Sequence, residues 1–152
     1  MLIKYRGILT ERTEDVPYGE YGALVVAMDC HRNCPGCFNQ HLKNTRYSTG
    51  TPEAIVDFIY DNPLHTWCIL GGLEWSEDPL GMVAIAQEAM RRGLKVIIYT
   101  GCREDEFMQR VDQALLKGCY IKFGEFDENL RTESKEELGV KMASSNQRIV
   151  RL

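Results

Sequence analysis

The sequence has 152 residues, of which 44% are hydrophobic and 26% charged, a composition typical of one globular domain with a buried core. Its net charge of −4 argues against a general nucleic-acid-binding protein, which needs a basic surface. The charged N-terminus does not resemble a signal peptide and no stretch approaches a membrane span, so we expect a cytoplasmic protein with no membrane partner.

Short apolar runs alternate with amphipathic segments along the chain. In chain order, the pattern predicts a strand at 22–28, a helix at 51–62, a strand at 66–70, a helix at 78–93, a strand at 94–100, a helix at 104–118 and a strand at 119–123. The last residues, QRIVRL, are a candidate for one more strand. The helix at 51–62 should begin with Thr51 as its N-cap and carry Ile55, Val56, Ile59 and Tyr60 on one apolar face.

The strands are apolar on both faces and alternate with helices, which indicates an α/β fold with a parallel sheet covered by helices. A closed barrel of eight strand–helix units needs about 250 residues. We therefore expect residues 1–152 to form a single domain, a partial, open barrel or open sheet of about five or six parallel strands. Trp67, Cys68 and Cys119 should lie in its core, whereas Trp75 is a candidate for the surface or a partner interface.

Unusual residues follow three of the predicted strands. A cysteine-rich loop follows the first, Gly71-Gly72 follows the second, and Thr100-Gly101 follows the third. Because the carboxyl ends of parallel strands lie at one edge of a sheet, we expect these three segments to face a common site.

The cysteine-rich loop has the spacing C-x3-C-x2-C, with Cys30, Cys34 and Cys37. In a reducing compartment such a cluster indicates a metal site or a catalytic site rather than disulfides. A structural zinc site needs a fourth ligand, for which His41 is within reach. A [4Fe–4S] cluster bound by three cysteines keeps one iron open to an outside ligand. The spacing favours the cluster and leaves zinc as the alternative.

Four motifs, in order along the chain, resemble one known family. The cysteine loop with CPGCFN at 34–39, the Gly-Gly pair, KVIIYTG at 95–101 and GVKMASSNQRIV at 139–150 resemble the radical S-adenosylmethionine superfamily, in particular the proteins that activate anaerobic ribonucleotide reductase. The resemblance implies a partial, open (β/α) barrel of the radical S-adenosylmethionine type.

The resemblance also implies an activity and partners. Cys30, Cys34 and Cys37 would hold a [4Fe–4S] cluster whose open iron binds S-adenosylmethionine. The reduced cluster would cleave this molecule to methionine and a 5′-deoxyadenosyl radical, which removes a hydrogen atom from a glycine of the large subunit of anaerobic ribonucleotide reductase. Flavodoxin or a similar low-potential carrier would supply the electron.

Cofactor-binding residues are assigned by the same resemblance. Gly71 and Gly72 would meet the methionine amino group, Tyr99, Thr100 and Gly101 would border the nucleoside, and Phe38 and Asn39 would pass the adenine. The family has an acidic residue directly after the two glycines, whereas here Leu73 intervenes and Glu74 comes next. This departure leaves open which residue binds the methionine amine, with Glu74 as a candidate cofactor-binding residue.

Three other functions fit the same core. One is activation of a different glycyl radical enzyme, another is a small-molecule reaction such as deazaguanine synthesis, and the third is a non-catalytic zinc or iron–sulfur module, for example in electron transfer. The chain is too short to close a barrel, and the lateral opening that results favours a loop of another protein as the substrate. The sequence leaves open what the segment 144–148 and Cys102 do.

Overall fold

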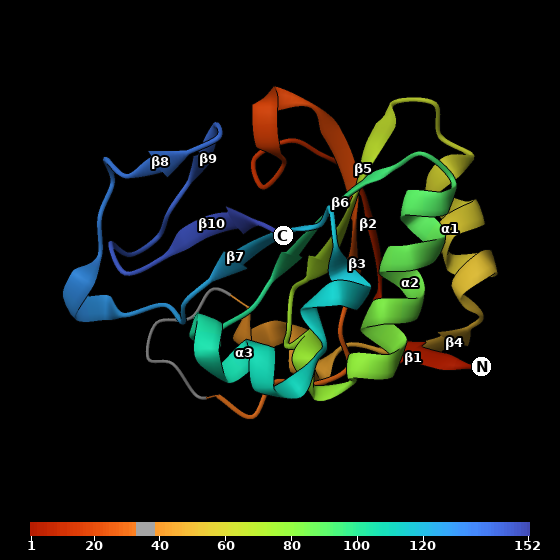
Figure 1. The fold of residues 1–152 in the computed structure, drawn as a ribbon, viewed down its shortest axis with the longest axis horizontal. Coiled ribbons are helices and arrows are strands. Elements are labelled where there is room, and N and C mark those ends of the chain that lie inside the picture. Colours follow the sequence, from red (N-terminus) through yellow and green to blue (C-terminus); the bar gives the residue numbers. More distant parts are fainter. Residues whose placement is uncertain (33–38) are drawn as a thin grey trace.

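The computed structural model describes residues 1–32 and 39–152. A six-stranded sheet with the order β10-β7-β6-β5-β3-β2 forms its centre (Figure 1). The four inner strands are parallel: β3 (Tyr21–Val26), β5 (His65–Gly71), β6 (Lys95–Tyr99) and β7 (Tyr120–Phe123). The edge strands β2 (Gly7–Arg12) and β10 (Arg148–Arg151) pair antiparallel with β3 and β7.

Over the described residues the fold is therefore the expected α/β open sheet: it has six strands, of which the four inner ones are parallel, and it does not close into a barrel. The parallel strands and the strand in QRIVRL are where the sequence predicts them, whereas β2 was not predicted. Most of β2 is exposed or half-buried, so it lacks the apolar run that marks the inner strands.

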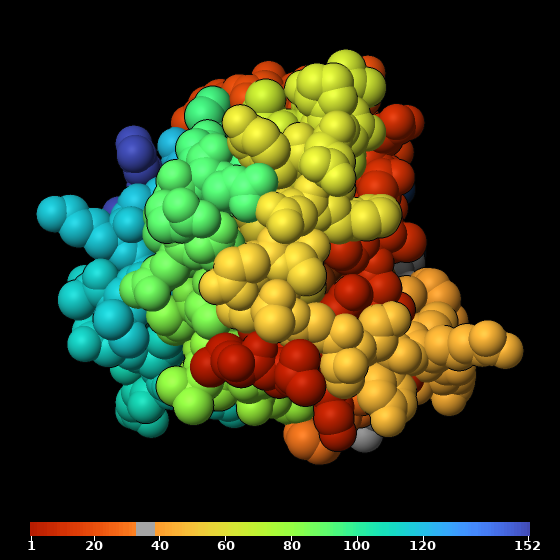
Figure 2. Space-filling model, turned by 90° about the vertical axis from the view of Figure 1, so that its right-hand side faces the viewer, coloured from red at the N-terminus to blue at the C-terminus, as the bar shows by residue number. Residues whose placement is uncertain are grey.

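Two helices cover one face of the sheet, α1 (Pro52–Tyr60) and α2 (Pro79–Arg91), and they pack against each other (Figure 1). Figure 2 shows the outer surface that they form, with the N-terminal residues beside them. The smaller pieces are β1 (Ile3–Tyr5) paired with β4 (Ser48–Gly50), the short helix α3 (Glu104–Arg110), and the hairpin of β8 (Glu136–Glu137) and β9 (Val140–Lys141).

Helix α1 begins as predicted, with the Thr51 hydroxyl accepting a hydrogen bond from the Ala54 N–H at 3.1 Å. Ile55 and Ile59 are fully buried, but the prediction that Tyr60 shares their face is wrong, since Tyr60 is exposed. One residue past Ile59 is a turn of about 100° around the helix axis, which takes the Tyr60 ring away from the core.

The helix predicted at 104–118 is shorter than expected. Helix α3 ends at Arg110, because Val111 has an extended backbone, and a separate 3-10 turn follows at Gln113–Leu116. The Asp112 side chain starts this turn by accepting a hydrogen bond from the Ala114 N–H at 3.0 Å.

The core contains Trp67, Cys68 and Cys119, as predicted. Burial raises the pKa of each of these two thiols to about 12. Trp75 does not lie on the surface, which corrects the expectation from sequence: its ring is buried and its indole N–H donates to the Val25 carbonyl at 2.9 Å. In the part of the chain that the structure describes, no helix is long and apolar enough to cross a membrane.

Candidate functional site

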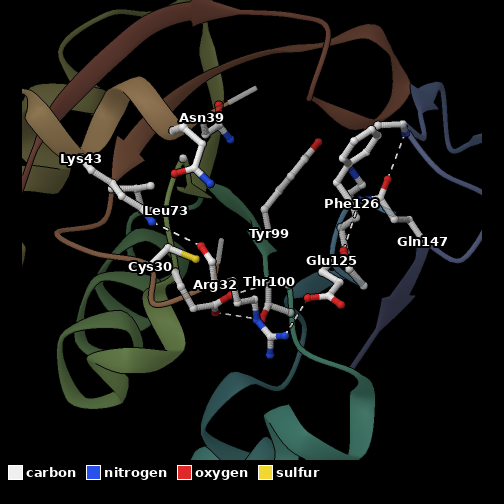
Figure 3. A pocket seen from close by; sticks show the side chains of 17 residues that line it. Cys30, Arg32, Asn39, Lys43, Leu73, Tyr99, Thr100, Glu125, Phe126 and Gln147 are labelled. Carbon is white, nitrogen blue, oxygen red and sulfur yellow. Dashed lines mark hydrogen bonds and ion pairs between the residues drawn. The ribbon is translucent and has the colours of Figure 1, made fainter. Parts of the chain in front are cut away.

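A pocket opens at the carboxyl ends of the parallel strands, where the three unusual segments come together (Figure 3). Of the residues predicted for the site, those that line this pocket are Cys30, Asn39, Gly72, Glu74, Tyr99, Thr100 and Gly101. Leu73, which separates Gly72 from Glu74, also lines it. Cys34, Cys37 and Phe38 lie outside the described residues.

Cys30 follows β3 and its half-buried thiol faces the pocket. Burial raises the pKa of the Cys30 thiol, so an electropositive ligand is needed to hold it as a thiolate at neutral pH. Neither nearby histidine joins Cys30 at the pocket: His31 bonds to Glu77 at 2.8 Å, and His41 is exposed on a 3-10 turn. Three thiolates from the cysteine motif would fit an iron–sulfur cluster better than a mixed zinc site.

Of the two glycines at the end of β5, Gly72 has a backbone conformation that requires glycine. Gly72 has a φ of +75°, and a Cβ there would lie 2.8 Å from a methyl group of Val26. Gly71 is buried at the end of β5, where its carbonyl accepts from the Ala27 N–H at 3.1 Å, and it does not line the pocket. Gly72 thus presents its main chain to the pocket, with Gly71 behind it.

Glu74 is buried and joins the ends of three strands. Its Oε2 accepts from the Thr100 hydroxyl at 2.9 Å and from the Ser76 hydroxyl and N–H at 2.7 and 3.2 Å, and its Oε1 accepts from the Gly101 N–H at 2.8 Å. The Glu74 N–H donates to the carbonyl of Asp29, next to Cys30, at 2.9 Å. The protein's own donors thus make four hydrogen bonds to Glu74, three to Oε2 and one to Oε1.

Arg32 crosses the mouth of the pocket from the cysteine loop (Figure 3). Its guanidinium donates to Glu125 at 3.1 Å and to Glu106 on α3 at 2.8 Å. The side chain passes so close to Gly101 that a Cβ there would lie 2.9 Å from its Cδ. Gly101 therefore makes room for Arg32, a role that the sequence did not indicate.

Cys102 is buried beside this arginine. Its sulfur accepts from the Arg32 guanidinium at 3.4 Å and lies 3.5 Å from the Ser76 hydroxyl. Cys102 thus links the cysteine loop to the residues around Glu74 but does not line the pocket.

Tyr99 and Lys122 form the next part of the wall. The Tyr99 hydroxyl donates to the Asp15 carbonyl at 2.7 Å, and the Lys122 ammonium lies 4.7 Å from the centre of the Tyr99 ring. Burial lowers the pKa of Lys122 to about 8. Lys122 was not among the residues predicted for the site. The one signal in the sequence is a lysine within an otherwise apolar strand.

The segment 144–148 holds the loop that follows β7. Its side chains bind main-chain atoms there: Asn146 donates to the Glu125 carbonyl at 2.8 Å, Gln147 donates to the Gly124 carbonyl at 3.2 Å, and Ser144 accepts from the Asp127 N–H at 3.2 Å. Arg148 forms an ion pair with Glu104 of α3. This segment, whose role the sequence left open, fixes the loop that carries Glu125 and Phe126 to the pocket.

A family model described as a 4Fe-4S single cluster domain matches residues 19–150. The match spans the cysteine motif, the ends of β5 and β6, and the segment 144–148. Domains of this kind are typical of radical S-adenosylmethionine activases. No curated protein sequence matches the chain significantly.

Proposed function

Because the chain belongs to the 4Fe-4S single cluster domain family, we propose that it is a radical S-adenosylmethionine activase that generates a glycyl radical on anaerobic ribonucleotide reductase. The observation that carries this proposal is the pocket in which Cys30, the backbone at Gly72 and the Thr100-Gly101 turn face one another. These three segments come from three successive parallel strands, where cofactors bind in open α/β sheets.

In this proposal, Cys30, Cys34 and Cys37 hold the cluster. When bound, it supplies the electron that cleaves S-adenosylmethionine reductively, with flavodoxin or a similar carrier as the electron source. Gly72 lets the main chain approach the methionine amino group, because it lines the pocket with a positive φ that residues with side chains rarely adopt. Glu74 supports that approach indirectly, by fixing Thr100 and Gly101.

The nucleoside is proposed to lie between Asn39 and the wall formed by Tyr99, Thr100 and Gly101. Asn39 and Tyr99 stand on neighbouring sides of the pocket (Figure 3). The Tyr99 ring is held in place by the bond of its hydroxyl to Asp15, so it offers a fixed apolar surface that excludes water.

A polypeptide substrate is favoured by the shape of the sheet. The sheet ends at the antiparallel strand β10 and does not curve back to β2, so nothing in the described chain encloses the pocket as a closed barrel would. A loop of a second protein could cover that opening and shield a reactive intermediate from solvent.

Anaerobic reconstitution tests the proposal. The protein should take up iron and sulfide, show the EPR spectrum of a reduced [4Fe–4S] cluster, and change that spectrum when S-adenosylmethionine is added. With reductant and the anaerobic ribonucleotide reductase of the same cell, a glycyl radical doublet should appear on the reductase. Zinc uptake without an EPR signal would contradict the cluster. Cleavage of S-adenosylmethionine without the doublet would point to another glycyl radical enzyme or a small-molecule substrate.

A further inference from the structure

Lys122 stands in the pocket wall, where the Asp15 carboxylate acts on its charge from beyond ion-pair distance. Within residues 1–32 and 39–152 it forms no ion pair, and its contact is with the face of the Tyr99 ring. Desolvation of this charge is costly, as the lowered pKa of Lys122 shows. A costly cation that lines a pocket points to an acceptor supplied by a ligand.

Lys122 lies beside the proposed nucleoside wall, since its ammonium is over the Tyr99 ring, but away from the proposed methionine contact. Gly72 follows β5 and Thr100 follows β6, whereas Lys122 lies on β7, one strand further along the sheet. Neighbouring strands are about 4.8 Å apart, so β5 and β7 are about 10 Å apart. The methionine amino group proposed at Gly72 would therefore lie two strands away from β7, and the response of Lys122 variants to S-adenosylmethionine distinguishes a contact with the cofactor from one with the substrate.

The other donors on this side of the pocket are already used by the protein. The amide of Gln147 donates to the Gly124 carbonyl and accepts from the Ala143 N–H at 3.0 Å. Glu125 is paired with Arg32 and adds negative charge to the same wall. A neutral oxygen acceptor suits this surrounding better than a second carboxylate does.

We propose that Lys122 donates a hydrogen bond to a main-chain carbonyl of the polypeptide substrate, beside the residue that loses its hydrogen atom. This rests on the proposed function and adds a binding subsite to it, formed by Lys122 and the loop at Gly124–Phe126. An extended peptide offers such a carbonyl at every residue, and an ammonium donor in a partly desolvated site binds it more strongly than a neutral donor would.

Two measurements on the reconstituted protein test this subsite. In the first, Lys122→Met should raise the concentration of anaerobic ribonucleotide reductase that gives half-maximal glycyl radical formation about tenfold, as expected for one charge-assisted hydrogen bond. The change in the cluster EPR spectrum with S-adenosylmethionine should match that of the wild type. Lys122→Arg should recover part of the loss, and Lys117→Met, at an exposed position before β7, should change neither value.

In the second, amine labelling of Lys122 in the wild type, read by mass spectrometry, should be reduced by the reductase and not by S-adenosylmethionine alone. Iron content and circular dichroism of Lys122→Met confirm that the variant is folded and loaded. Loss of the S-adenosylmethionine response in Lys122→Met would overturn the proposal by placing Lys122 in the cofactor site, and unchanged reductase dependence would overturn it as well. Absence of a glycyl radical in the wild type, with normal S-adenosylmethionine cleavage, would instead reject the proposed function and this subsite with it.

Discussion

The carboxylate of Glu74 accepts a hydrogen bond from the backbone N–H of Gly101 at 2.8 Å, and this contact joins the turn after β5 to the turn after β6. The same carboxylate accepts from the Thr100 hydroxyl, so Glu74 sets the shape of two neighbouring sides of the pocket. Glu74 thus positions the turn after β6 while it also lines the pocket.

Replacing Glu74 with glutamine should destabilise the apo protein by about 1–3 kcal/mol, because the amide nitrogen cannot accept the hydrogen bonds that one carboxylate oxygen accepts. Urea unfolding at pH 7 measures this change. The matched control is Glu133→Gln at an exposed position, which should unfold like the wild type. Equal stability of Glu74→Gln and wild type would show that Glu74 does not tie the two turns together.

Alanine at Cys30, Cys34 or Cys37 should abolish an oxygen-sensitive [4Fe–4S] centre, because two protein ligands remain where three are needed. Iron content and EPR after anaerobic reconstitution report the loss. Alanine at Cys68, Cys102 or Cys119, all buried, should leave the centre intact. The ligand assignment fails if a variant of the second group loses its iron while one of the first keeps it.

Gly72→Val should keep the cluster and lose the response of its EPR spectrum to S-adenosylmethionine, since a branched side chain would block the backbone edge. The positive φ of Gly72 and its closeness to Val26 add a cost in stability of about 1–3 kcal/mol, seen as an earlier urea midpoint. A normal EPR response in Gly72→Val would remove Gly72 from the cofactor site.

Cys68 and Cys119 should resist thiol reagents in the native apo protein. With pKa values of about 12, their thiolate fraction at pH 8 is about one in ten thousand, and both side chains are buried. Labelling with a disulfide reagent, followed by mass spectrometry, should modify them only after denaturation. Modification of either at the rate of an exposed thiol would mean that this part of the core opens readily.

Lys122 should make the stability of the apo protein depend on pH in the alkaline range. Its pKa is about 8 in the folded protein and about 10.5 in the unfolded chain, so between these values the unfolded state binds more protons and the wild type gains stability as pH rises. Below pH 8 both states are protonated and the charge cost is constant. The stability of Lys122→Met relative to the wild type should therefore fall from pH 8 to pH 10. Asp15 and Tyr99, which face Lys122, are present in both proteins.

Urea midpoints at pH 7, 8, 9 and 10 measure this dependence. Lys117→Met serves again as the control, because Lys117 is exposed and lies outside the pocket. A constant difference between Lys122→Met and wild type over the whole range would show that Lys122 is fully hydrated in the folded state.

The sequence predicts those parts of the fold whose apolar pattern is strong. Strands β5 and β6 are apolar on both faces, and their place at a common edge follows from parallel pairing alone. The edge strand β2 alternates weakly, so no local signal marks it. Trp75 was misplaced because its burial depends on a carbonyl of β3, fifty positions earlier, that no local pattern reveals.

In the candidate site, too, residues with a local sequence signal could be predicted and those defined by long-range contacts could not. Motif residues such as Gly72 and Thr100 were found because their neighbours in sequence carry the signal. Arg32 reaches Glu106 and Glu125, which lie 74 and 93 positions further along the chain. The pKa of Lys122 is likewise lowered by its burial beside Tyr99. Long-range contacts and desolvation decide these roles, and both exist only once the chain has folded.

The contacts of Asn146, Gln147 and Ser144 with the loop after β7 are made to main-chain atoms of that loop. Every amino acid other than proline carries the same main-chain groups, so the residues of the loop can be substituted in evolution while the loop keeps its conformation. Related proteins could therefore keep the SSNQ segment while they exchange residues 125–127 to follow changes in their targets. In that case the SSNQ segment sets the shape of the loop, and new partners are acquired through the side chains of the loop.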